Sequence, residues 1–375
     1  MLIKFWGAER VLLELIWLFP DADIFTLLYD EKKMQAFFPG KQIHCIGPAQ
    51  WLFCLTGKPR WSLPLMPASV RKIDLSGYDV VISSSSGFAH GVMTTGQTKN
   101  ICYYHSPARY LWDATDEVQA ELGVSWGKWQ KNIFWYIKAH VGGFFVRGLF
   151  HQLRKYDLKA SKKPHFVIAN SEEVRKRIQT YYHRDALILW PPVDTHRFSV
   201  GSIPVSQRTQ YVLTSALTPF KRVDRVVRVM TRLGMQVQII GDGKERQSLE
   251  KIAGKNIQFL GRVSDSELVE IYKSARGFLM PQKEDAGIAP LEAMAAGVPV
   301  YWFGHGWLLE TNIDGVTGRF YSEDTDESFE AWFLRFHQEI SQGKYDNSSF
   351  LIERAREFDG AHFRESFQRI IQDYV

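Results

Sequence analysis

Residues 284–297, EDAGIAPLEAMAAG, combine two carboxylates with small residues that leave the backbone accessible. They follow an apolar run typical of a buried strand, and Pro290 suits the first turn of a helix. The segment between the carboxylates contains Ala286, Gly287, Ile288 and Ala289. Backbone N–H groups at such a helix start can bind an anion, which makes the segment a candidate diphosphate site. Glu284 and Glu292 could hydrogen-bond vicinal hydroxyls, one pair on a sugar and one on a ribose; the alternative is two solvated glutamates around an ordinary turn.

The elements that must position these residues alternate between strands and helices, a pattern typical of doubly wound parallel α/β sheets. We expect buried strands, covered on both faces, at residues 23–28, 79–83, 100–104, 166–170, 186–189, 211–214, 237–240, 257–260, 277–280 and 298–301. Pro191 and Pro192 interrupt the series, because two prolines cannot continue a ladder. We therefore expect one domain over residues 1–196, completed by an amphipathic helix over 359–375, and a second domain over 197–358. Ligands of such sheets bind at the carboxyl ends of the strands.

On these motifs the chain resembles the retaining glycosyltransferases of group 1, also called family 4. The hallmark of that family is a pair of glutamates separated by seven residues, in which the second glutamate begins a Glu-Ala-Met-Ala-x-Gly helix. Residues 284–297 match this motif throughout. The resemblance extends from residues 7–10, GAER, to the closing helix. It implies the GT-B fold, in which two Rossmann-like domains face a central cleft. It also implies front-face transfer of a sugar with retention, and no covalent enzyme intermediate.

The resemblance places the nucleotide-sugar donor on the C-terminal domain. Residues 214–224 match the strand, loop and helix that grip the diphosphate, with Lys221 as the phosphate-binding lysine and Arg222 beside it. Gly241 follows the next strand. Arg262 and Val263 match positions that meet the nucleotide base. Most relatives have arginine at the position of Ala216, and whether Arg222 compensates for its loss is an open question.

In the N-terminal domain, residues 104–113, YHSPARYLWD, resemble a family segment that begins at a strand end, and His105 is then the residue facing the donor sugar. Gly7 matches the second glycine of a loop that approaches the diphosphate, but Trp6 stands in place of the first. Few residues precede Gly7, so we expect the usual first strand of this sheet to be missing or incomplete. The polar turn at residues 83–88 suits either the acceptor side or a plain loop.

Together these residues predict a metal-independent hexosyltransferase. Glu284 and His105 would be the catalytic residues, which orient the sugar, while Glu292 would fix the ribose. No metal is expected, because no carboxylate pair or histidine cluster is placed to hold one. We favour UDP-glucose as donor and a saccharide or lipid-linked saccharide acceptor in polysaccharide biosynthesis. Transfer from GDP-mannose is the close alternative, and a catalytically silent nucleotide-sugar-binding subunit is the rival from another class.

Composition limits the remaining possibilities. The net charge of +5 gives no argument for nucleic acid as a partner. Cys45, Cys54 and Cys102 lack the spacing of a disulfide framework or a zinc site. Such free cysteines favour a reducing cytoplasm. No run of eighteen apolar residues predicts a membrane span. Residues 126–163 mix aromatic and basic side chains, and would either touch an anionic inner membrane peripherally or form a buried helical hairpin.

Overall fold

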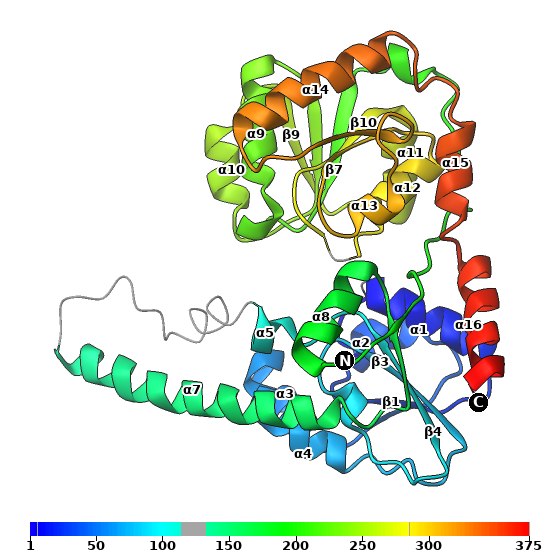
Figure 1. Ribbon diagram of the computed structural model, residues 1–375. Coiled ribbons are helices and arrows are strands. Elements are labelled where there is room, and N and C mark those ends of the chain that lie inside the picture. The colour runs from blue at the N-terminus through cyan, green and yellow to red at the C-terminus, as the bar shows by residue number, and fades with distance from the viewer. Residues whose placement is uncertain (6, 114–132, 285, 375) are drawn as a thin grey trace. The chain divides into compact units, whose positions relative to one another are not determined.

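The computed structural model describes residues 1–5, 7–113, 133–284 and 286–374 (Figure 1). The chain forms two compact units. The N-terminal unit consists of Met1–Trp190 and Arg364–Val375, and the C-terminal unit of Pro191–Phe363. The division thus falls slightly before the expected boundary at 196/197. Within the C-terminal unit, Val193 forms a parallel bridge with Asp359 and donates its N–H to Phe358 O at 2.8 Å, so the first and last segments of this unit are joined to each other.

The C-terminal unit is built on a six-stranded sheet of order β12-β11-β10-β7-β8-β9, in which every pair is parallel. The strands are β7 (Gln210–Thr214), β8 (Val237–Ile240), β9 (Ile257–Gly261), β10 (Ala275–Met280), β11 (Val300–Phe303) and β12 (Gly318–Tyr321). The sequence predicts the first five, although β11 begins two residues later than expected. Because all strands run the same way, the segments after β7, β8, β9 and β10 lie along one edge of the sheet.

Helices cover both faces of this sheet, as Figure 1 shows for α9 and α14 on one side of β7 and α11 and α12 on the other. The helices and 3₁₀ turns are η4 (Val205–Gln207), η5 (Pro219–Lys221), α9 (Val223–Leu233), α10 (Arg246–Ile252), α11 (Asp265–Ser274), α12 (Ala289–Ala295), α13 (Leu308–Thr311), α14 (Asp326–Ser341) and α15 (Ser349–Arg356). Tyr211 and Leu213 of β7 join the core beneath α9 and α14. Val212 between them is also buried, which is why β7 is apolar without alternation.

The N-terminal unit contains two separate parallel sheets. One has the order β3-β4-β5-β6 and the other pairs β1 with β2. The strands are β1 (Ile24–Thr26), β2 (Ile43–Cys45), β3 (Val80–Ser85), β4 (Lys99–Tyr104), β5 (Phe166–Ala169) and β6 (Leu187–Ile188). In the described part of the chain, Leu2 makes only a single bridge, to Tyr29, so no strand precedes the first helix. The expected full strand at 23–28 is reduced to three residues.

Strand β6 corrects one expectation. Residues 186–189 were expected to be covered on both faces, but Leu187 and Ile188 are both exposed. The reason is that β6 is a two-residue edge strand that pairs only with β5. An apolar run alone does not distinguish an edge strand from a central one.

The helices of the N-terminal unit are α1 (Gly7–Leu18), α2 (Glu31–Met34), α3 (Pro48–Thr56), α4 (Met66–Arg71), α5 (Arg109–Trp112), α7 (Ile133–Ala160) and α8 (Glu172–Tyr182), with 3₁₀ turns η1 (Gln35–Phe37), η2 (Pro59–Leu65) and η3 (Ala89–Gly91). Helix α16 (Gly360–Tyr374) brings residues 364–374 back to this unit. Among the described residues, none of the helices is both long and apolar enough to cross a bilayer.

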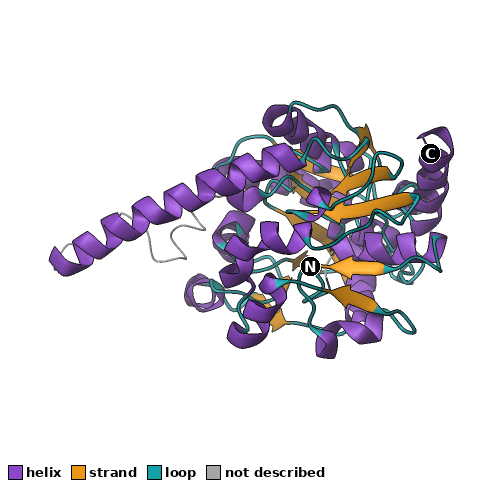
Figure 2. Cartoon of the chain, turned by 90° about the horizontal axis from the view of Figure 1, so that it is seen from below, coloured by secondary structure: helices purple, strands orange, loops and turns teal. Residues whose placement is uncertain are grey.

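The aromatic and basic segment 126–163 is only partly described. Residues 126–132 lie outside the described residues, and side chains are described from Arg147 onward. From Ile133 the segment forms the long helix α7, which Figure 2 shows as a single continuous helix. In its second half, Phe150 and Leu153 are buried in the core of the unit. That half therefore packs as a structural helix.

Candidate active site

Lys221 and Glu284 form an ion pair at the carboxyl edge of the C-terminal sheet. Lys221 ends the 3₁₀ turn after β7, and Glu284 lies in the loop after β10. The two strands are neighbours, so the segments that follow them lie side by side. Gln282 Nε2 donates a second hydrogen bond, at 3.2 Å, to the same Glu284 oxygen. The structure thus brings together the residues predicted to bind phosphate and sugar.

The backbone of the loop after β10 is held by Trp307, which is fully buried. Its N–H donates to Glu284 O and its indole Nε1 to Gly287 O, both at 3.0 Å. A Cβ at Gly287 would lie 2.6 Å from Glu284 Cγ, so only glycine fits without moving that side chain. Ala286, Gly287 and Ile288 before α12 are half-buried. Sequence reasoning missed Trp307, because nothing in its spacing links it to this loop.

Glu292 lies in the first turn of α12 and is only 4% exposed. Arg197 Nη2 donates to its Oε1 at 2.8 Å, while Arg197 Nη1 lies 3.2 Å from a carboxylate oxygen of Asp265. The Arg197 guanidinium also stands over the ring of Phe198, 4.7 Å from its centroid. Arg197 therefore holds the carboxylate that was predicted to bind ribose. Sequence reasoning missed it, because 95 positions separate the two residues.

Two glycines at this edge are explained by the packing of the backbone itself. Gly241 has φ +123°, and a Cβ there would lie 1.9 Å from Ser215 O. A Cβ at Gly243 would lie 2.2 Å from Leu217 O. The turn after β8 therefore requires both glycines for its contact with the loop after β7. Their presence alone does not identify a ligand site.

Arg262 and Val263 follow β9, just before the Ser264 capping box of α11. Arg262 is exposed and Val263 is half-buried. They lie at the same carboxyl edge as Lys221 and Glu284, since β9 is part of the same parallel sheet. Their predicted contact with the base stays a prediction.

Arg222 is bound to a carboxylate within the protein. It adopts the left-handed conformation, φ +50°, at the start of α9, and its Nη1 donates to Asp324 Oδ2 at 2.6 Å. The other oxygen of Asp324 pairs at 2.6 Å with Arg225, which is almost fully buried. Ala216 lies half-buried in the loop after β7. In this structure the guanidinium of Arg222 is thus engaged by Asp324.

His105 lies at the carboxyl end of β4 in the N-terminal unit. Its N–H donates to Ser85 O at 2.9 Å, its carbonyl accepts from Asn170 Nδ2 at 3.0 Å, and its Nε2 lies 2.7 Å from Ser84 Oγ. Burial lowers the pKa of His105 to about 4. The imidazole is therefore neutral near pH 7. Ser84, which was expected in a polar turn, belongs to β3, because it pairs with Tyr103 of β4, and it is the hydrogen-bonding partner of His105.

Gly7 opens α1 and is exposed. A Cβ at this position would meet nothing within 4 Å, so the protein's own packing does not require glycine there. This leaves the backbone at the start of α1 open to close approach. The predicted contact of Gly7 with a diphosphate is not tested by this observation.

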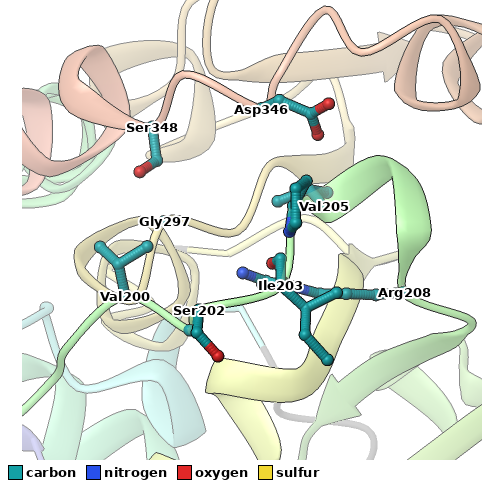
Figure 3. A pocket seen from close by; sticks show the side chains of 10 residues that line it. Val200, Ser202, Ile203, Val205, Arg208, Gly297, Asp346 and Ser348 are labelled. Atoms are coloured by element: carbon teal, nitrogen blue, oxygen red, sulfur yellow. Dashed lines mark hydrogen bonds between the residues drawn. The ribbon is translucent and has the colours of Figure 1, made fainter.

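A separate cavity of about 130 Å³ lies in the C-terminal unit, between the segment that enters it and the loop before α15. Figure 3 shows Asp346 and Ser348 across from Val200 and Ser202. Arg208 on its wall donates to the carbonyls of Ile203 and Ala275 at 2.9 and 3.0 Å. None of the predicted donor residues lines this cavity, and its charged groups serve the local backbone.

Comparison with known proteins agrees with the two-unit organisation. Residues 6–197 match the model of "Glycosyltransferase Family 4", and residues 202–340 match that of "Glycosyl transferases group 1".

The curated relatives include mannosyltransferases by name. A GDP-mannose-dependent alpha-(1-6)-phosphatidylinositol monomannoside mannosyltransferase from Mycolicibacterium smegmatis is 29% identical over 177 residues, which is 40% of this chain and 46% of that protein. A GDP-mannose-dependent monoacylated alpha-(1-6)-phosphatidylinositol monomannoside mannosyltransferase from Corynebacterium glutamicum is 32% identical over 102 residues, 23% of this chain and 27% of that protein. The aligned segments thus span less than half of each relative.

Solved structures share the fold along most of the chain. Anabaena HepE in complex with UDP has a TM-score of 0.70 at 14% identity, covering 99% of this chain and 97% of that one. The sucrose-phosphate synthase from Thermosynechococcus elongatus has a TM-score of 0.62 at 15% identity, covering 85% and 79%. At these identities the likeness shows the fold alone.

Proposed function

The chain belongs to the group 1, or family 4, glycosyltransferases with the GT-B fold of two Rossmann-like domains, and on that premise we propose that it transfers a hexose from a nucleotide diphosphate sugar to a saccharide acceptor. The observation that carries the proposal is the contact of Lys221 with Glu284 at the carboxyl edge of the C-terminal sheet. This pair combines a cation for a diphosphate with a carboxylate for sugar hydroxyls. Open α/β sheets bind their ligands at this edge.

In the proposed reaction, Lys221 and the backbone N–H groups before α12 stabilise the leaving diphosphate as its negative charge develops. Glu284 orients the sugar through its hydroxyls and is not assigned as a nucleophile. Glu292, held by Arg197, binds the ribose hydroxyls. Departure and attack take place on one face of the sugar, so the anomeric configuration is retained. The role of His105 on the donor sugar is part of this proposal.

We favour UDP-glucose as the donor. GDP-mannose is the second candidate, and the printed names of the curated relatives favour it. The acceptor is proposed to be a saccharide, free or lipid-linked, in polysaccharide biosynthesis. A cytoplasmic location is proposed because all three cysteines are free thiols, as expected in a reducing compartment.

The test is nucleotide release from a panel of UDP- and GDP-sugars, with and without a membrane extract that supplies acceptors. Lys221→Ala should abolish release, while Lys273→Ala is the matched control, because Lys273 pairs with Glu270 on its own helix α11. Nucleotide binding without turnover on any donor would favour the silent-subunit alternative.

The same assay tests metal independence. Release should continue in EDTA, since Lys221 and backbone N–H groups are proposed to stabilise the diphosphate in place of a metal ion. Complete loss in chelator that Mg²⁺ or Mn²⁺ restores would contradict the proposed chemistry.

A further inference from the structure

Helix α3 and the 3₁₀ turn η2 present three large apolar side chains to solvent in the N-terminal unit. Trp51 is 64% exposed, Leu55 64% and Trp61 60%. Trp51 and Leu55 stand one helical turn apart and share a face of α3. Trp61 lies on η2, which packs directly against α3. We name these three residues the α3–η2 patch.

The part of the patch on α3 lies on the outer side of a helix whose inner side is also apolar. Ala49 is buried, and Phe53, Leu63 and Leu65 pack against the core of the unit. Helix α3, PAQWLFCLT, contains no charged residue at all. A surface helix of a soluble protein normally carries polar residues opposite its buried stripe. The outer side of α3 instead has the composition of a surface that meets an apolar phase.

The segment that carries the patch has only positive charge. The chain has 41 acidic residues, yet none of them falls between Glu31 and Asp74, the longest acid-free stretch in the sequence. The basic residues in that stretch are Lys32, Lys33, Lys41, Lys58, Arg60, Arg71 and Lys72. Lys58 and Arg60 are exposed beside the patch, and Lys58 Nζ stands 5.9 Å from the centroid of the Trp61 ring.

We propose that the α3–η2 patch docks the protein on the surface of an anionic lipid bilayer. Tryptophan side chains favour the level of the headgroups, because one part of the indole is apolar and its N–H is polar. Leu55 would enter the acyl boundary, while Lys58 and Arg60 meet anionic headgroups. A second copy of this chain is a poor occupant, since two like patches would bring their basic residues together. The proposal goes beyond the transferase activity and does not depend on which donor is used.

The experiment is co-sedimentation of the full chain with vesicles of phosphatidylcholine alone, and with vesicles in which about a third of the lipid is phosphatidylglycerol. The protein should bind the anionic vesicles, and added salt should weaken binding as it screens the charges. Trp51→Ser combined with Trp61→Ser should lower the partition coefficient about tenfold or more. Lys58→Glu combined with Arg60→Glu should remove the preference for anionic vesicles.

Trp17→Ser is the matched control, because Trp17 on α1 is 65% exposed but lies outside the acid-free stretch. It should bind vesicles as the unaltered chain does. Circular dichroism and UDP binding establish that each variant is folded, without reference to turnover. The proposal is overturned if the unaltered chain does not bind anionic vesicles, or if the double tryptophan variant binds as well as Trp17→Ser. It is also overturned if patch variants change only the oligomeric state in light scattering.

Discussion

Lys221 and Glu284 are joined by an ion pair although 63 positions separate them in the chain. A bound diphosphate would offer Lys221 a second anionic partner. Lys221→Met should therefore weaken UDP binding by about 1.5–3 kcal/mol, the range for a hydrogen bond to a charged group. Glu284→Gln should leave UDP affinity unchanged or slightly higher, because it removes a competing carboxylate, while turnover falls. Titration calorimetry and steady-state kinetics separate the two effects. Loss of UDP binding in folded Glu284→Gln would refute the assigned roles.

Variants of Glu292 and Arg197 should separate an effect on nucleotide affinity from an effect on the free energy of unfolding. Glu292→Ala should weaken UDP binding, and deoxyribose donors should lose less than ribose donors. Arg197→Met should lower the free energy of unfolding by about 1.5–3 kcal/mol, since it deprives a buried carboxylate of its arginine.

The matched control for that change is Arg232→Met, which breaks a more exposed pair with Glu330 and should cost about 0–1 kcal/mol. Urea unfolding measures both variants. Equal losses at the two positions would mean that Arg197 does not stabilise Glu292. Equal losses for ribose and deoxyribose donors would remove Glu292 from the ribose.

His105 predicts a pH dependence of stability. Its pKa of about 4 in the folded protein lies below the ordinary value of 6.5. Between pH 6.5 and pH 4, His105 therefore takes up a proton in the unfolded chain but not in the folded chain. Stability should be unaffected by His105 above pH 6.5 and should fall as the pH decreases toward 4, by at most about 1.4 kcal/mol per pH unit.

Urea unfolding at pH 7.5 and pH 5 checks this, with His105→Gln as the comparison that lacks the titrating group. The unaltered chain should lose more stability than the variant between these two pH values. An identical loss in both would show that His105 titrates normally in the folded state.

Ala216→Arg tests whether the phosphate site lacks a guanidinium. Arg222 is engaged by Asp324, so the new arginine should join Lys221 at the phosphates without competing with Arg222 for them. It should tighten UDP binding by about 1–2 kcal/mol, because arginine can contact phosphate with two donors. Calorimetry on the folded variant gives the answer. Flat or weaker binding would mean that another group fills the position, and Ala216 would no longer support the silent-subunit alternative.

The sequence predicted the central strands β5, β7 and β10 well because each has a run of at least three consecutive buried residues, most of them apolar. The elements it missed, β2 and β12, are short: β2 pairs with β1 alone, and β12 lies at the edge of its sheet. Gly318 at the start of β12, with φ +149°, resembles a turn residue when only the sequence is known. Whether a strand lies at the edge of a sheet depends on which strands pair with it, and the local pattern of apolar residues does not contain that information.

The candidate site was predicted as separate motifs, each tied to a strand end. That a lysine after β7 should touch a glutamate after β10 follows only once these strands are neighbours. The same holds for Arg197, which comes from the segment before the sheet. The motifs identified residue types suited to the chemistry, whereas their partners depended on tertiary packing.

Helix α16 has a consequence for biosynthesis. Arg364 pairs with Glu14 and stands over Trp17, and Phe367 is buried against Phe19, so the N-terminal unit includes residues made after the entire C-terminal unit. A ribosome needs roughly 10–35 s to add residues 191–363 at about 5–20 residues per second. During that interval the nascent N-terminal unit lacks the cover of α16, while the C-terminal unit can complete its own sheet. The half of the protein that emerges first is therefore the half that finishes folding last.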